Sequence, residues 1–312
     1  PEVELVGDIY HVLARLGEEL RDAPFHDSAP GSTALRDVVA GRLEEARHDV
    51  GVAAAVCFPT DTAGVAACVE VARRHDRPFV ARGSGTGLAG GAVPLDGAVV
   101  ISTTRMNAVR SVDLEQRVAW VEPGVINLDL TRALLPHGVH FAPDPSSQQA
   151  CSIGGNVANN AGGPHCLAYG VTSAHVVALE VVLPDGTVTV LGRPDGVAEV
   201  PGLDLRGAFV GSEGTFGIAT AVAVRLTPNP PAVQTMLVDF ARVEDAAAAV
   251  SAVIAAGVVP AALEMMDARI TQAVEDFVHA GFPTDAAAVL LVEVDGLPGG
   301  VATEAALVAD VV

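Results

Sequence analysis

Lysine is absent from the sequence, so all 18 basic side chains are arginines, and 38 acidic side chains outnumber them. The resulting formal net charge of -20 argues against a nucleic-acid-binding protein, because binding to phosphates depends on a basic surface. Aromatic residues amount to only 4% of the chain, so Ala, Val and Leu must fill most of the core. No apolar run reaches the roughly 18 residues that a membrane-spanning helix needs, so we expect no transmembrane segment.

Cysteine is scarce, and its positions follow no metal-binding spacing. Cys57, Cys68, Cys151 and Cys166 form no C-x-x-C pair, so the sequence indicates neither a zinc site nor a redox motif. Reduced, buried thiols of this kind are typical of a cytoplasmic protein. The first residues, PEVELVGDIY, lack the basic and apolar regions of a signal peptide. We therefore expect a cytoplasmic location.

Glycine and proline are abundant by contrast, with 32 and 20 residues, which is more turn and loop chemistry than a helical bundle needs. The length of 312 residues predicts two domains. Three prolines in TPNPPA (227–232) can continue neither a strand nor a helix, and they mark the boundary. We predict a helical N-terminal segment (1–50), a first domain (51–228) and a second domain (232–312).

Hydrophobic periodicity places the elements within these segments. A helix is expected over 3–22, and strands alternate with helices from residue 53 onward. The segment 141–170 is predicted to be a long loop, followed by a hairpin over 173–191. The second domain has a ferredoxin-like α+β pattern that is unfinished at its end, with expected strands at 233–240, 260–267 and 287–296 and helices at 243–257 and 268–281.

The stretch RGSGTGLAGG (82–91) contains G-x-G-x-x-G, the spacing of a Rossmann dinucleotide-binding loop. A Rossmann loop continues into a helix, whereas Pro94 and the Asp96-Gly97 turn lead here to another strand. The alternatives are a tight barrel corner, a flexible tip and a phosphate-binding loop between two strands. Five glycines from Gly83 to Gly91 expose backbone amides that can bind an anion, so we favour the phosphate-binding loop.

Two further glycine-rich segments follow in the same domain. FAPDPSSQQACSIGGNVANNAGG (141–163) combines paired glycines with three asparagines and small apolar residues. Such a segment either satisfies its backbone through side chains or a ligand, or is an ordinary Asn/Gly-rich surface loop. GSEGTFGI (211–218) repeats the pattern. One large ligand with phosphates and a flat ring would account for all three segments.

Six motifs resemble, in order, those of the FAD-linked oxidase family of vanillyl-alcohol-oxidase (PCMH) type: PFVARGSGTGLAGGAVP, VEPGV, DPSSQQACSIGGNVANNAGG, YGVT, LPDGTV and GSEGTFGI. They are most similar to the branch with the glycolate oxidase flavoprotein subunit, D-lactate dehydrogenase and D-2-hydroxyglutarate dehydrogenase. The resemblance covers residues 52–228 densely and continues weakly into 260–267. It implies an FAD-binding domain of two α+β subdomains, followed by a cap domain.

The resemblance also implies which residues bind the cofactor FAD. The first glycine segment would hold the pyrophosphate, the second would line the flavin, and the third would complete the pocket. Thr86 stands where some relatives carry the histidine that attaches FAD covalently, so we expect non-covalent FAD. The implied cofactor-binding residues are Arg82, Gly83, Ser84, Gly85, Thr86, Gly87, Leu88, Pro143, Asp144, Ser147, Gly154, Gly155, Asn156, Asn160, Gly162, Glu213, Gly214 and Ile218.

By the same resemblance the protein is an enzyme, an FAD-dependent 2-hydroxy-acid dehydrogenase or oxidase. It would oxidise D-lactate, glycolate or D-2-hydroxyglutarate by hydride transfer to flavin N5. Relatives carry a histidine-rich metal and base motif and a substrate arginine in a later region, which does not occur before Val312. His137, His140 and His165 are poor substitutes, so we assign no catalytic residue and no metal ligand. We expect the chain to be incomplete, with any divalent metal held by residues beyond 312.

Two alternatives stay open. One is a non-catalytic FAD-binding subunit of a larger oxidase complex. The other is the related FAD-dependent reductase of cell-wall precursor synthesis, which the 2-hydroxy-acid-type motifs disfavour. The implied partners are a small 2-hydroxy acid and an electron acceptor, namely a quinone, a cytochrome or a partner flavoprotein or iron–sulfur subunit. The sequence does not determine the oligomeric state, and a homodimer is one of the states that it allows.

Overall fold

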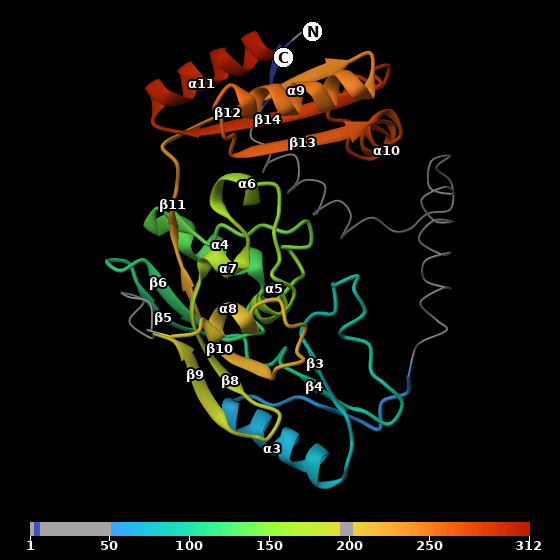
Figure 1. Cartoon of the computed structure of the whole chain (residues 1–312), viewed down its shortest axis with the longest axis vertical. Helices are drawn as coiled ribbons and strands as arrows, with labels where there is room; N and C mark the ends of the chain where they lie inside the picture. The colour runs from blue at the N-terminus through green and yellow to red at the C-terminus, as the bar shows by residue number, and fades with distance from the viewer. Residues whose placement is uncertain (1–2, 7–50, 194–201) are drawn as a thin grey trace. The chain divides into compact units, whose positions relative to one another are not determined.

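The structure is a computed structural model that describes residues 3–6, 51–193 and 202–312 (Figure 1). Contacts between residues divide the described chain into two compact units. The larger unit comprises residues 51–163, 169–193 and 202–229, and the smaller unit comprises residues 3–6, 164–168 and 230–312. The division near residue 230 falls inside the proline-rich segment. No pattern in the sequence indicates that residues 164–168 belong to the smaller unit.

A parallel sheet opens the larger unit, in the order β2 (Ala55–Cys57), β4 (Val99–Ser102) and β3 (Phe79–Arg82). Helix α3 (Thr62–Arg74) is capped at its N-terminus by Asp61, whose carboxylate accepts a hydrogen bond from the Gly64 amide at 2.7 Å. The buried residues of α3 recur at helical spacing and pack in one apolar cluster with the β4 side chains. They are Val65, Val69 and Ala72.

A five-stranded antiparallel sheet, in the order β5–β6–β10–β8–β9, forms the other part of the larger unit. Strands β8 and β9 make the predicted hairpin. One face of the sheet is buried in a cluster that includes side chains of α4 and α5. The strands are β5 (Val109–Asp113), β6 (Val118–Val121), β8 (Val176–Val182), β9 (Val188–Gly192) and β10 (Ile218–Arg225).

Short elements connect the strands of this unit or extend its edges. The helices are α4 (Asn127–Leu134), the 3-10 helix η1 (Leu135–His137), α5 (Ile153–Asn159), α6 (Cys166–Tyr169), α7 (Thr172–His175) and α8 (Leu205–Phe209). Strand β7 (Val139–His140) pairs with β11 (Thr227–Pro228). By its contacts, α6 begins among the residues of the smaller unit.

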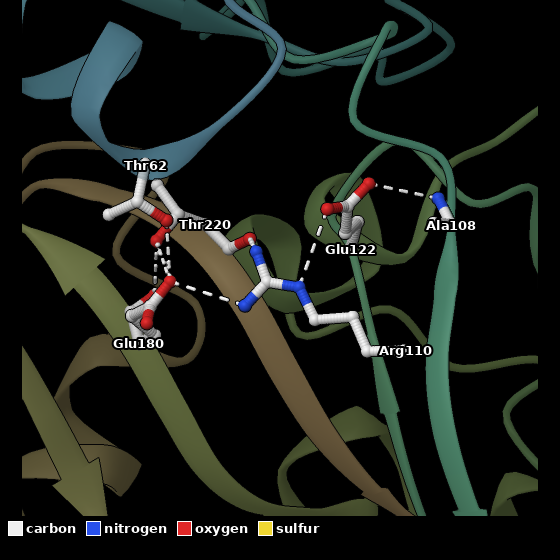
Figure 2. A network of polar contacts seen from close by, with 6 residues as sticks. All are labelled: Thr62, Ala108, Arg110, Glu122, Glu180 and Thr220. Atoms are coloured by element: carbon white, nitrogen blue, oxygen red, sulfur yellow. Dashed lines mark hydrogen bonds and ion pairs between the residues drawn. The ribbon is translucent and has the colours of Figure 1, made fainter.

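A polar network joins α3 to the five-stranded sheet (Figure 2). The Thr62 and Thr220 hydroxyls donate to Glu180 Oε1 at 2.6 and 2.9 Å. Arg110 lies between two carboxylates, with Nη1 3.4 Å from Glu180 and Nε 3.3 Å from Glu122. Burial acts to raise the pKa of Glu180, but the hydroxyl hydrogen bonds and the Arg110 charge outweigh it, so this pKa lies below its usual range. The network therefore holds a charged Glu180 at the junction of helix and sheet.

The smaller unit is an antiparallel sheet in the order β1–β12–β14–β13. One face packs with α9 and α11 around Val238 and Leu290, and the other face packs with α10 around Leu237 and Leu291. The strands are β1 (Val3–Val6), β12 (Ala232–Phe240), β13 (Ala262–Asp267) and β14 (Ala288–Gly296). The helices are α9 (Val243–Ala255), α10 (Ala268–Val278) and α11 (Pro298–Val311). Both units confirm the α+β prediction.

Two predicted elements are wrong. Residues Val3–Val6 form a strand that pairs with β12 rather than the start of a helix, because pairing with a distant strand overrides local periodicity. The remainder of the expected 3–22 helix, and the rest of the segment 1–50, lie outside the described residues. The expected loop at 141–170 contains α5, although two glycines and an asparagine in its first turn lower helix propensity. Capping and burial of Ile153 and Val157 compensate for that weakness.

Candidate cofactor-binding site

The first glycine segment lies between β3 and β4 and contains no helix. Gly85 and Gly90 have φ angles of 74° and 87°, which side-chain-bearing residues rarely adopt. Arg82, at the end of β3, donates from Nη1 to the Ala92 carbonyl at 3.3 Å, so its guanidinium spans the two ends of the loop. The strand–loop–strand arrangement confirms the prediction against a Rossmann unit.

The second glycine segment packs directly on the first. Ser152 caps the N-terminus of α5, and its hydroxyl accepts a hydrogen bond from the Gly155 amide at 3.4 Å. A Cβ added to Gly83 would collide with Ser152 Oγ, and one added to Gly154 would lie 2.7 Å from Pro123 Cβ. The glycines are therefore required because α5, the loop and the segment before α4 approach one another closely.

These segments surround a cavity of about 390 Å³ in the larger unit, within the range of small-molecule sites. The third glycine segment closes it, with Glu213 Oε2 3.4 Å from the place that a Gly91 Cβ would occupy. Fourteen of the 18 sequence-predicted residues line this cavity: Arg82, Gly83, Ser84, Gly85, Thr86, Gly87, Leu88, Ser147, Gly154, Gly155, Asn156, Glu213, Gly214 and Ile218.

The other four predicted residues, Pro143, Asp144, Asn160 and Gly162, are not among those that line the cavity. The Pro143 carbonyl accepts a hydrogen bond from Asn127 Nδ2 at 2.8 Å. Asn160 ends α5 with a φ of 47°, and its Oδ1 accepts from the Ser173 amide at 2.8 Å. Asp144 is buried, with its backbone against Gly163. Pro143, Asp144 and Asn160 therefore contact other residues of the larger unit and do not form the cavity surface.

Several lining residues were missed by the sequence reasoning. Most of them lie inside the three glycine segments, so membership of a segment was the signal that could have found them. Outside the segments, Ala81, Ala92, Thr103, Pro123, Phe209 and Ala219 carry no such signal. The missed residues are Ala81, Ala89, Gly90, Gly91, Ala92, Thr103, Pro123, Pro145, Cys151, Ser152, Val157, Ala158, Asn159, Ala161, Phe209, Gly217 and Ala219.

The lining is chemically suited to a large ligand with phosphates and a flat apolar ring. Arg82 and Glu213 are its charged side chains, and glycine and alanine form much of the remaining surface. A Cβ at Gly90 would meet no atom within 4 Å, so the loop leaves open space beside its backbone. Asn156 is 1% exposed, and its Nδ2 has no hydrogen-bond partner among the residues that the structure describes. An unpaired buried donor in a glycine-lined cavity fits a bound ligand with acceptor atoms, as FAD has.

The fold, the cavity and the sequence matches define a flavoprotein, and the chain belongs to the FAD-linked oxidases. Residues 53–192 match the FAD binding domain family, and residues 229–311 match the C-terminal domain of FAD linked oxidases. It is 45% identical to the glycolate oxidase subunit GlcD of Escherichia coli over 82% of this chain and 51% of that protein. It is 36% identical to a D-lactate dehydrogenase of Anaerostipes hadrus over 70% of this chain and 46% of that protein.

A solved alkyldihydroxyacetonephosphate synthase has a similar fold, with a TM-score of 0.71 at 23% identity, over 82% of this chain and 49% of that structure. The chain spans about half the length of the relatives it matches. The predicted family and the FAD cofactor are thus confirmed.

Two of the three histidines considered as metal ligands or bases, His140 and His165, make other contacts. His140 Nδ1 lies 2.9 Å from Asn229 Oδ1, and His165 Nε2 lies 2.9 Å from Glu293 Oε1 inside the smaller unit. Thr235 donates to the other Glu293 oxygen at 3.1 Å, and the side chains of His165, Thr235 and Glu293 are all buried. In the part of the chain that the structure describes, no group of three metal-ligating side chains occurs. No helix over these residues is long and apolar enough to cross a membrane.

Proposed function

We propose that the protein is an FAD-dependent dehydrogenase or oxidase of small 2-hydroxy acids. The observation that carries this proposal is the 45% identity to a glycolate oxidase subunit across a chain whose glycine segments surround one cavity. The D-lactate dehydrogenase relative supports the same class of substrate. When bound, FAD supplies the electron-accepting ring for the oxidation.

The chain's own residues bind and orient the cofactor in this proposal. The amides of the Gly83–Leu88 loop hold the pyrophosphate, because closely spaced N–H groups without side chains accommodate an anion. Arg82 stabilises the loop that presents them. Glu213, with a φ of 53°, faces the loop near Gly91 and offers a carboxylate to a hydroxyl of the cofactor. Thr86 in place of a linking histidine favours non-covalent FAD.

The protein's partners and location are part of the proposal. The relative's description as a subunit favours a larger oxidase complex, in which electrons pass to a quinone, a cytochrome, or a flavoprotein or iron–sulfur subunit. Four cysteines without disulfides in the described residues favour the cytoplasm. A chain that only binds FAD within such a complex is the second candidate function.

Two measurements test the proposal. The purified chain titrated with FAD should quench flavin fluorescence and become yellow, and heat should release unmodified FAD. A preparation that stays colourless and cannot be reconstituted contradicts the proposal. Anaerobic addition of D-lactate, glycolate or D-2-hydroxyglutarate to the full-length flavoprotein should bleach the flavin. Retained colour with every hydroxy acid would favour the electron-transferring subunit.

A further inference from the structure

Residues 162–171, which include α6, form a loop that closes on itself at the end of the second glycine segment. Thr172 fastens its base, because the Thr172 amide and hydroxyl both donate to the Ala161 carbonyl, at 3.0 and 2.7 Å. Ala161 lines the cavity, and Thr172 is buried at the start of α7. The loop therefore begins at the cavity wall, whereas its middle, residues 164–168, belongs to the smaller unit.

A buried polar contact holds the middle of this loop in the smaller unit. His165 Nε2 lies 2.9 Å from Glu293 Oε1, and the two side chains are only 5% and 3% exposed. An ionised carboxylate only accepts hydrogen bonds, so the ring N–H is the donor. Thr235 lies opposite Glu293 on β12 and donates to Oε2 at 3.1 Å. Removing His165 would take away the donor of a buried carboxylate, which is strongly unfavourable.

The connection between Ala161 and His165 has little conformational freedom. A Cβ added to Gly163 would collide with the carbonyl oxygen of Asp144, so Gly163 lies directly against that buried backbone. Pro164 follows, and its ring fixes its φ angle. Because two of the three intervening residues are constrained, a displacement of His165 is passed on to Ala161 and is not absorbed by the loop.

We propose that His165 and Glu293 are positioning residues for the cofactor cavity, and that their contact lets the smaller unit contribute to FAD affinity without lining the cavity. This inference rests on the proposed FAD site. Neither residue is among those that line the cavity. The coupling is reciprocal, because a contact that strengthens FAD binding must itself be strengthened by bound FAD. Bound FAD therefore stabilises the sheet that carries Glu293.

Hydrogen–deuterium exchange of the full chain, with and without saturating FAD, measures this coupling. In wild type, FAD should slow exchange at least threefold both in the first glycine segment (82–91) and in β14. In His165→Ala, FAD should still slow exchange in 82–91, but the response of β14 should be lost. FAD affinity in a fluorescence titration should fall about fivefold or more, the lower end of typical couplings between sites. His137→Ala is the matched control, because His137 is exposed and outside the cavity, and it should behave as wild type.

Two further variants separate coupling from simple loss of folding. His165→Gln keeps an N–H donor of similar reach and should retain most of the β14 response. Pro164→Gly keeps the His165–Glu293 contact but frees the connection to Ala161. In Pro164→Gly, β14 should exchange as in wild type without FAD, and its response to FAD should fall by at least half. A purely structural role of His165 predicts an unchanged response in Pro164→Gly.

The outcomes separate this inference from the proposed function. Failure of the wild-type chain to bind FAD overturns the proposed function itself. If wild type binds FAD but β14 does not respond, or if the response persists in His165→Ala, the positioning role is wrong. If His165→Ala exchanges β14 rapidly even without FAD, Pro164→Gly decides, and an undiminished response there overturns the inference.

Discussion

Substitution of Glu180 tests how α3 is held on the five-stranded sheet. In Glu180→Ala, the Thr62 hydroxyl loses its carboxylate acceptor, the Thr220 hydroxyl keeps only the Glu180 backbone carbonyl at 3.3 Å, and Arg110 loses one of two carboxylates. Each hydroxyl bond is worth about 1 kcal/mol. The ion pair adds less than 1 kcal/mol, because the Arg110 side chain is 34% exposed. We expect the free energy of unfolding of the larger unit to fall by about 2–3 kcal/mol.

Glu180→Gln separates the hydrogen bonds from the charge. Its amide oxygen still accepts from both threonines, so the loss should be about 0.5–1 kcal/mol. Urea unfolding followed by the fluorescence of Trp120, the single tryptophan of the chain, reports on strand β6 of the same sheet. Glu70→Gln removes surface ion pairs with Arg73 and Arg74 and should have no measurable effect. A Glu180→Ala midpoint equal to that of Glu70→Gln would refute the role given to the network.

Three further predictions concern the larger unit. Gly83→Ala places a Cβ on Ser152 Oγ and should weaken FAD binding at least tenfold in a fluorescence titration, whereas Gly299→Ala, with open space around it, should bind FAD like wild type. Burial lowers the pKa of His175 from 6.5, so the stability that the neutral His175 side chain contributes is complete above pH 6.5 and is lost as the pH falls below 6.5. Urea midpoints should therefore drop between pH 7 and 5, and the drop should be less steep in His175→Gln. Asp61→Ala removes the cap of α3 and should cost about 1 kcal/mol in urea unfolding, with an unchanged midpoint counting against the cap.

The glycine loop was predictable from the sequence because its role depends on local chemistry. Positive φ angles at Gly85 and Gly90 require glycine, and Pro94 excludes a following helix, so neighbouring residues alone determine a loop between strands. The same segment predicted Arg82 and Thr86 as cofactor-binding residues, and both line the cavity. Local structure was predictable where the constraint and the residues that impose it are adjacent in the sequence.

The elements and contacts that the sequence did not predict depend on residues that are distant in the chain. Residues Val3–Val6 become a strand because β12, more than 200 residues away, offers a pairing edge. Helix α5 forms because Ile153 and Val157 are buried in a core assembled from distant strands. His165 pairs with Glu293, a partner that no local pattern connects to it. Each depends on tertiary contacts, which a single sequence does not show.

The composition of the cavity wall indicates which part of the proposed reaction the larger unit performs. Among the described lining residues there is no histidine, and the charged groups are one arginine that spans its own loop and one glutamate. A general base for a 2-hydroxy acid needs a group that exchanges a proton near neutral pH. The Cys151 thiol is unsuited to this role, because burial raises its pKa above the ordinary value of 9.0. The larger unit therefore binds and orients the cofactor, and the proton acceptor of the proposed reaction must come from residues outside this wall.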